Sequence, residues 1–125
     1  MRLWHQDLIS KLPRQQLLGQ HRECCALRGN GWGKKHSVVD YVFQHSPEKL
    51  FYYHTVVMDE MKNRGYVPDS NWRNAGYRGK QCEPYDFDFI SKDYNSSEII
   101  YPEHDKNYLE ECLDNLQNKG YNIGS

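Results

Sequence analysis

The amino-acid sequence predicts a compact all-α domain of three main helices connected by long loops. Three segments repeat apolar residues at helical spacing, and two of them end alike, with Asn, Lys or Arg, Gly and Tyr in succession. The chain has 125 residues, which is enough for one domain with a modest hydrophobic core. We therefore expect residues 1–125 to fold as a single domain.

The first expected helix covers residues 13–28. Pro13 suits the first helical position, and Gly29 provides a stop. At about 100° per residue, one side of this helix gathers apolar side chains. These should pack inward: Leu17, Leu18, Cys24 and Cys25.

An ionised pair lies on the other side of the same helix. Arg22 and Glu23 point away from the apolar side, and only the small residues Gly19 and Ala26 lie between them on the helical wheel. A charged pair above small side chains leaves room for a large molecule to approach. Because a solvated helix surface is the more common explanation of an isolated Arg–Glu pair, a second feature is needed to indicate function.

The second and third helices show similar signals. Ser46-Pro47-Glu48 combines a cap, a first-turn proline and a carboxylate near the positive helix end, and Gly65 should end this helix. Apolar residues recur at helical spacing in both segments: Leu50, Val57, Met58 and Met61 in the second, and Leu109, Cys112, Leu113 and Leu116 in the third. His54 lies within the second stripe, and we expect it to be a hydrogen-bonded core residue rather than a ligand.

Two connections carry aromatic and basic residues together. Glycines surround Trp32 in residues 29–33, and Lys34 and Lys35 follow directly. Residues 69–103 form a long aromatic segment whose first part interleaves rings with cations: Trp72, Arg73, Tyr77, Arg78 and Lys80. Alternating rings and cations are typical of nucleic-acid binding. The alternative is that the rings complete the core, with residues 83–89 adding a short strand.

The charges nearly balance but are unevenly distributed. Lys and Arg number 16 against 17 Asp and Glu, for a net charge of −1. Residues 1–80 hold 13 basic and 7 acidic residues, a net of +6, whereas residues 81–125 hold 3 and 10, a net of −7. Such a distribution suits a protein that meets a polyanion with one side, unless folding mixes the two parts.

Composition also bounds location and cofactors. No apolar run reaches the ~18 residues that a membrane span needs, and no signal peptide opens the chain. Four cysteines, two of them adjacent, do not form a disulfide framework, so we expect reduced thiols in a cytoplasmic monomer without a metal or other cofactor. A metal site is the weaker alternative, because adjacent cysteines point about 100° apart on a helix. Its ligands would be His21, Cys24 and Cys25, with His5, His36 or His45.

The amino terminus supplies the second feature. Met1 precedes the large Arg2, so we expect it to be retained, because initiator methionine is normally removed only before a small residue. An α-amine has a reference pKa of about 8, against about 10.4 for lysine, so more of it is unprotonated at neutral pH. A neutral amine beside a carboxylate such as Glu23 is the minimum for imine chemistry at a sugar or carbonyl carbon.

The order of residues behind this amine is distinctive. Arg2 comes first, followed by Leu8-Ile9-Ser10, Leu12, Gln15, Leu17-Leu18 and Arg22-Glu23. Over residues 1–28 this order resembles the amino-terminal region of the pyrimidine dimer DNA glycosylases, and the rest of the chain resembles them more loosely. The resemblance implies a DNA repair glycosylase with AP lyase activity. It would act on pyrimidine dimers, or on related damaged or abasic sites, in double-stranded DNA.

The resemblance also implies roles for individual residues. The Met1 amine would attack the sugar of the damaged nucleotide and displace its base. Glu23 would stabilise the developing positive charge and assist strand cleavage by β-elimination. Together with the basic loops, the resemblance suggests these DNA-binding residues: Arg2, Gln15, Arg22, Arg28, Lys34, Lys35, Arg73, Arg78 and Lys80.

Three departures from the family pattern accompany the match. Gln16 and Ala26 replace a histidine and an arginine of the family, and we expect Arg28 to take over the lost phosphate contact. The family's basic last helix and aromatic tail are replaced by an acidic helix, and its usual threonine amine by Met1. The alternative function is a nucleic-acid-binding module without catalysis, in which Glu23 only pairs with a neighbouring cation.

Overall fold

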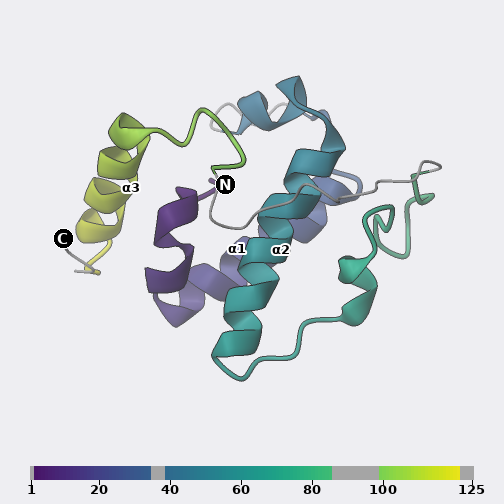
Figure 1. The fold of residues 1–125 in the computed structure, drawn as a ribbon, viewed down its shortest axis with the longest axis horizontal. Coiled ribbons are helices and arrows are strands. Elements are labelled where there is room, and N and C mark those ends of the chain that lie inside the picture. Colours follow the sequence, from purple (N-terminus) through teal and green to yellow (C-terminus); the bar gives the residue numbers. More distant parts are fainter. Residues whose placement is uncertain (1, 35–38, 86–98, 122–125) are drawn as a thin grey trace.

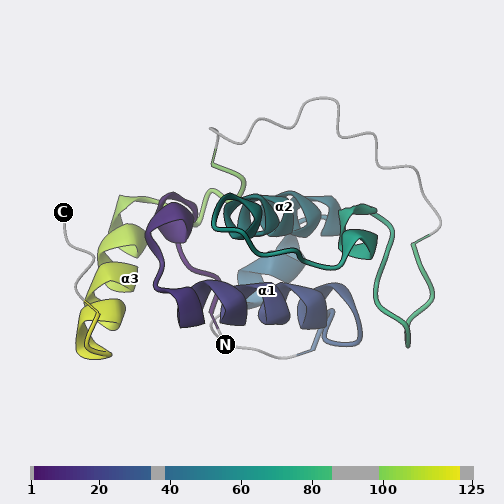
Figure 2. The same cartoon turned by 90° about the horizontal axis from the view of Figure 1, so that it is seen from below.

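The computed structural model describes residues 2–34, 39–85 and 99–121. Their helices follow in the order η1 (Gln6–Lys11), α1 (Arg14–Arg28), η2 (Asp40–Gln44), α2 (Pro47–Asn63), η3 (Ser70–Arg73) and α3 (Lys106–Asn118), where η marks a 3-10 helix. No strand occurs in these ranges, so the all-α prediction is confirmed. α1 and α2 lie against each other as two layers, and α3 stands at one end, with η1 between it and α2 (Figure 1 and Figure 2).

The three α-helices begin and end close to the predicted positions. Pro13 is the cap of α1 rather than its first residue, and Pro47 opens α2 as expected. Gly65 follows the end of α2 with a φ of 90°, a conformation that glycine adopts without strain. At the start of α3, the Asp105 side chain accepts a hydrogen bond from the Tyr108 backbone N–H.

The hydrophobic core lies where η1, α1 and α2 meet. Side chains from the amino-terminal segment and from all three α-helices are fully buried in it, including Leu3, Leu17, Leu27, Leu50, Tyr53, Val57, Cys112 and Leu116. On the predicted inward side of α1, Leu17 and Cys24 are buried, whereas Leu18 and Cys25 are half-buried. The buried face of α1 is therefore narrower than the sequence predicted.

Aromatic residues of the loops complete this core. Trp32 packs edge-on against Phe43, with ring centroids 5.0 Å apart, and Trp72 lies against His54 with centroids 5.8 Å apart. Tyr101 is fully buried. These rings cover the helices, as the alternative interpretation of the loops expected. Of the predicted short strand, residues 83–85 are not in a strand, and residues 86–89 lie outside the described residues.

All four cysteines are unpaired, and Cys24 and Cys112 are buried, in agreement with the expectation of reduced thiols. Across the described ranges, none of the helices combines the length and apolar character that crossing a membrane requires.

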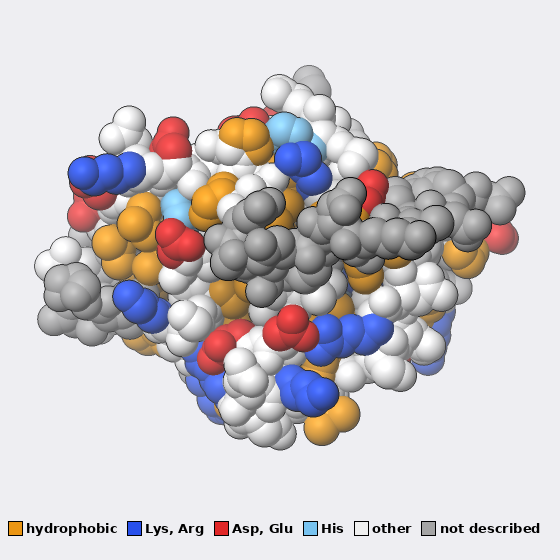
Figure 3. Space-filling model, viewed as in Figure 1, with side chains coloured by type: hydrophobic (Ala, Val, Ile, Leu, Met, Phe, Trp, Pro, Cys, Tyr) orange, Lys and Arg blue, Asp and Glu red, His pale blue; other side chains and the backbone are white. Residues whose placement is uncertain are grey.

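Acidic and basic side chains share the surface. On the face shown in Figure 3, the described Lys and Arg residues are interspersed with Asp and Glu. Folding therefore mixes charges on this face that the sequence keeps apart.

Candidate active site

Glu23, the predicted catalytic carboxylate, lies half-buried on α1. It accepts a hydrogen bond from the Gln20 side chain, with 3.0 Å between Gln20 Nε2 and Glu23 Oε2. Burial raises the pKa of the Glu23 carboxyl above its usual value, and the neighbouring Arg2 backbone N–H and the Gln20 hydrogen bond oppose that shift. Glu23 therefore takes up a proton at a higher pH than an exposed glutamate does, which suits a group that exchanges protons in a reaction.

Gln20 connects Glu23 to the amino-terminal segment. Its side chain is only 1% exposed, and Oε1 lies 2.6 Å from the Trp4 backbone N–H nitrogen and 2.9 Å from the Tyr53 hydroxyl. On the other side, Nε2 donates to the Arg2 backbone carbonyl at 2.9 Å as well as to Glu23. Both Nε2 hydrogens and one acceptor position of Oε1 are used, so the orientation of the amide is fixed.

Two tyrosines from the other α-helices hold the same segment. The Tyr53 hydroxyl on α2 donates to the Trp4 carbonyl at 2.5 Å, and the Tyr108 hydroxyl on α3 donates to the Leu3 carbonyl at 2.6 Å. Side chains of α1, α2 and α3 therefore all bind the backbone of residues 2–4. This segment is fixed against Glu23 by the whole helical arrangement rather than by its own sequence.

Met1, the predicted nucleophile, lies outside the described residues. The next residue, Arg2, has a half-buried side chain whose guanidinium lies over the rings of Trp4 and Tyr108, at 5.8 and 5.7 Å from their centroids. It also lies 3.7 Å from a carboxylate oxygen of Glu111 on α3. The Arg2 side chain is thus largely engaged with the protein.

Several predicted DNA-binding residues are exposed. The Arg22 side chain makes no hydrogen bond or ion pair with the described part of the chain, and Lys34 and Lys80 are also exposed. Gln15 is exposed and accepts a long hydrogen bond, 3.4 Å, from the Tyr121 hydroxyl. Lys35 lies outside the described residues.

The other predicted contacts are committed to the protein. Arg28 is only 4% exposed and donates to the backbone carbonyls of Trp72, Asn74 and Tyr77 at 2.8–3.1 Å. The expectation that Arg28 replaces a phosphate contact therefore does not fit its position, because this guanidinium faces the interior. Arg78 likewise donates to the backbone carbonyl oxygens of residues 28 and 29.

Arg73 forms an exposed ion pair with Asp59, with 2.7 Å between Arg73 Nη1 and Asp59 Oδ1. Such a pair is worth little in water and exchanges readily for another anion. Arg73 therefore remains accessible to a phosphate, unlike Arg28.

Sequence reasoning overlooked Gln20. Helical spacing could have indicated it, because this spacing places Gln20 on the same face of α1 as the buried Leu17 and Cys24. A polar side chain on an inward face must find hydrogen-bond partners. Those partners lie in the amino-terminal segment and on α2, which the sequence does not reveal.

The described residues thus define an all-α protein whose amino-terminal segment is anchored beside an acidic side chain of its first long helix. The family model described as pyrimidine dimer DNA glycosylase matches residues 1–74, which is more than half of the 125 residues. The chain belongs to this family, and the predicted resemblance is confirmed. Membership indicates a DNA glycosylase that binds damaged DNA. No curated protein and no solved structure matched the chain.

The family match covers the residues of α1 and α2 that form the candidate site. Gln20, Glu23 and Tyr53 all lie within residues 1–74, whereas Tyr108 and the rest of α3 lie beyond them. α3 therefore adds a support for the amino-terminal segment from outside the family match.

Proposed function

We propose that this protein is a DNA glycosylase with AP lyase activity, in which the Met1 α-amine is the nucleophile and Glu23 the catalytic carboxylate. The observation that carries the proposal is the Gln20 amide, whose Nε2 donates to both the Arg2 backbone carbonyl at 2.9 Å and Glu23 at 3.0 Å. The amine nitrogen of residue 1 is joined to the Arg2 amide nitrogen through one residue's backbone, a span of at most about 3.7 Å. This short connection supports the proposal that the terminal amine acts beside Glu23.

The reaction divides into two stages. The unprotonated amine attacks the anomeric carbon of the damaged nucleotide, the bond to the base breaks, and the base leaves with a proton. The sugar ring then opens to a protonated imine, which is the electron sink for the second stage. Loss of a proton from the adjacent sugar carbon expels the 3′ phosphate, and water later releases the enzyme.

Glu23 serves both stages. As a carboxylate it stabilises the positive charge that develops on the sugar, and in a half-buried position this stabilisation is stronger than in bulk water. In the second stage it accepts the proton from the sugar carbon. Burial raises the pKa of Glu23, which brings it closer to that of a group that can both take and return a proton near neutral pH.

The proposed substrate is double-stranded DNA that carries a pyrimidine dimer, a related damaged base or an abasic site. Such lesions weaken stacking and pairing, which lowers the cost of bending the duplex and exposing the sugar. Arg22, Lys34 and Lys80 are exposed cations that can contact phosphates, and Arg73 can do so by exchanging its partner Asp59. Gln15 is exposed and also remains a candidate, Arg2 and Arg78 are half-buried candidates, and Lys35 lies outside the described residues.

Reductive trapping tests the nucleophile directly. Protein with a native amino terminus is mixed with dimer-containing or abasic duplexes and borohydride, which converts an imine into a stable amine. We expect a covalent adduct that peptide mapping assigns to Met1. A glycine inserted before Met1, or chemical acetylation of the terminal amine, should abolish the adduct. An adduct on a lysine such as Lys34 would contradict the proposal.

A matched pair of substitutions tests the carboxylate. Glu23→Gln should reduce strand cleavage at least about 100-fold while damaged duplex still binds. Glu110→Gln, at an exposed position on α3, is the control and should leave cleavage unchanged. If the native protein binds damaged duplex but never cleaves it, the protein is a nucleic-acid-binding module without catalysis.

A further inference from the structure

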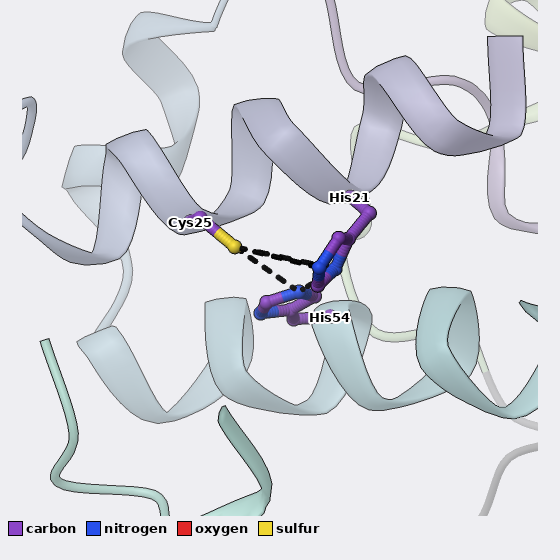
Figure 4. A group of neighbouring side chains, drawn as sticks. All are labelled: His21, Cys25 and His54. Carbon is purple, nitrogen blue, oxygen red and sulfur yellow. Dashed lines mark hydrogen bonds between the residues drawn. The ribbon is translucent and has the colours of Figure 1, made fainter. Parts of the chain in front are cut away.

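Two histidines and a cysteine meet between α1 and α2. His21 and Cys25 lie one turn apart on α1, and His54 faces them from α2 (Figure 4). His21 Nδ1 and His54 Nε2 are 2.8 Å apart, and Cys25 Sγ lies 4.0 Å from each of these nitrogens. His21 and Cys25 are half-buried and His54 is fully buried, so the three donor atoms form a partly sheltered cluster.

We propose that His21, Cys25 and His54 bind a zinc(II) ion through His21 Nδ1, Cys25 Sγ and His54 Nε2. Zinc prefers tetrahedral sites built from imidazole nitrogen and thiolate sulfur. With ordinary bond lengths, such a site separates two nitrogens by about 3.3 Å and a nitrogen from a sulfur by about 3.6 Å. Each observed separation differs from these values by about half an ångström, which side-chain rotation can supply.

Only part of this set was expected from the sequence. The metal site considered there as the weaker alternative grouped His21 with Cys24 and Cys25, but Cys24 is fully buried and does not belong to the cluster. Of the histidines considered as partners, His45 instead contacts Glu103 at 3.0 Å. His54 supplies the missing donor, from a position on α2 that lies 26 residues beyond the end of α1 at Arg28.

A cavity borders the cluster on the side of Cys25, where a fourth ligand can enter. Cys25 and Asp69 line the same cavity, of about 450 Å³, with Trp72 in its wall. Asp69 therefore supplies a carboxylate to the cavity beside Cys25, where its negative charge can offset part of the charge of a bound ion. Three protein ligands with one open position is the arrangement of zinc sites that also bind water or another small ligand.

Arg28 limits the affinity that this site can reach. Its Nη1 lies 2.8 Å from His54 Nδ1, and a guanidinium only donates, so His54 carries its proton on Nε2 when no metal is bound. When zinc binds Nε2, the neutral His54 ring carries its proton on Nδ1 instead, and this Nδ1–H then faces the guanidinium of Arg28. Arg28 must then give up this one contact, but it keeps its three bonds to backbone carbonyls.

The zinc site and the proposed active site are separate. His21 and Cys25 are each two residues from Glu23, which places them about 200° around α1 from it. The imine chemistry at Met1 requires no metal. Binding of the ion and cleavage of DNA can therefore succeed or fail independently, and the test below does not use activity.

Cobalt(II) is a spectroscopic probe for this donor set. The full chain, without a histidine tag and freed of metal, is titrated with Co²⁺ under reducing conditions. We expect one equivalent to produce the near-ultraviolet thiolate-to-cobalt band and the intense visible bands of tetrahedral cobalt, and Zn²⁺ to displace it. Cys25→Ser should remove the thiolate band and weaken zinc binding at least about 100-fold.

Matched variants locate the site. His21→Gln should weaken binding as Cys25→Ser does, and both positions are half-buried, so these variants are expected to fold. Cys82→Ser, which changes another cysteine lining the same cavity, and His45→Gln should bind cobalt like the native protein. Circular dichroism checks each fold. Zn²⁺ should raise the Tm of the native protein and of both controls, but not of the cluster variants.

Two results would overturn the proposal. One is the absence of a thiolate band and of any Tm increase with equimolar metal in the native protein. The other is a band that persists in folded Cys25→Ser or disappears in folded Cys82→Ser.

Discussion

At the scale of single residues, Gln20 determines how the amino-terminal segment meets Glu23. Its oxygen binds the Trp4 N–H, and its nitrogen binds both the Arg2 carbonyl and Glu23. An amide is suited to this place because it presents an acceptor on one side and donors on the other. Neither a carboxylate nor an apolar side chain can satisfy both sides.

The variant Gln20→Glu tests this role with almost no change in shape. The new oxygen faces the Arg2 carbonyl and the Glu23 carboxylate, so acceptors oppose acceptors. We expect a loss of about 2–4 kcal/mol in the free energy of unfolding at neutral pH, and a cleavage rate at least about 10-fold lower. Urea unfolding and a strand-cleavage assay measure the two effects. Gln117→Glu, at an exposed position of α3, should change stability by less than about 0.5 kcal/mol, and equal behaviour of the two variants would contradict this role.

How much of the site the sequence could reveal depends on the distance along the chain between the partners. Glu23 was identified from the helical wheel and from its register with the amino terminus, both of which are local properties. The hydrogen bond from Tyr108 to Leu3 joins residues 105 positions apart, and that from Tyr53 to Trp4 spans 49. No periodicity within one helix encodes such pairs, so the supports of the segment became visible only in the folded chain.

At the scale of elements, α1 carries two arginines with different tasks. Arg28 is buried between the rings of Phe51 and Trp72, at 5.3 and 5.0 Å from their centroids, and its hydrogen bonds hold the loop after α2. Burial lowers the pKa of Arg28 to about 10, which still leaves it charged at neutral pH. Arg22, six residues earlier, is exposed.

Substituting each arginine by methionine separates the two tasks. Arg28→Met leaves three carbonyls in the interior without their donor and should cost about 3–5 kcal/mol of unfolding free energy. Arg22→Met should change stability by less than about 0.5 kcal/mol, but weaken DNA binding and reduce the slope of log K against log salt by about 1. Urea unfolding and binding titrations at several salt concentrations provide the measurements. A stable Arg28→Met protein with weakened DNA binding would show that Arg28 contacts phosphate after all.

The helices themselves were predictable, and the short elements were not. α1, α2 and α3 follow from apolar spacing and from proline and glycine signals that act within a few residues. The 3-10 helix η1 holds buried Leu8 and Ile9, but its six residues are too few for a period to emerge. Trp72 was grouped with nucleic-acid-binding rings because its neighbour Arg73 is basic, yet it packs on His54. Its neighbours in space, rather than those in sequence, decide its role.

At the scale of the whole molecule, buried histidines couple folding to pH. His104 is 2% exposed, and its Nε2 lies 2.6 Å from the Tyr41 hydroxyl, while its Nδ1 has no partner among the described residues. Burial and, to a smaller extent, the nearby His5 lower the pKa of His104 to about 3, against the opposing effect of Asp105. A protonated His104 would place an additional proton on the unpartnered Nδ1 in the interior, which the folded state disfavours.

The sign of the pH dependence follows from this shift. In the unfolded chain a histidine takes up a proton near pH 6.5, whereas in the folded protein His104 does so only near pH 3. The stabilisation is therefore fully present above pH 6.5 and is lost progressively as the pH falls between these two values. By pH 5 it amounts to a loss of about 2 kcal/mol in unfolding free energy. His104→Gln, which keeps a hydrogen-bonding atom near Tyr41 but does not titrate, should lose correspondingly less between pH 7 and pH 5. Urea unfolding at both pH values, for the native and the variant protein, gives the two differences, and if they are equal, His104 does not couple folding to pH.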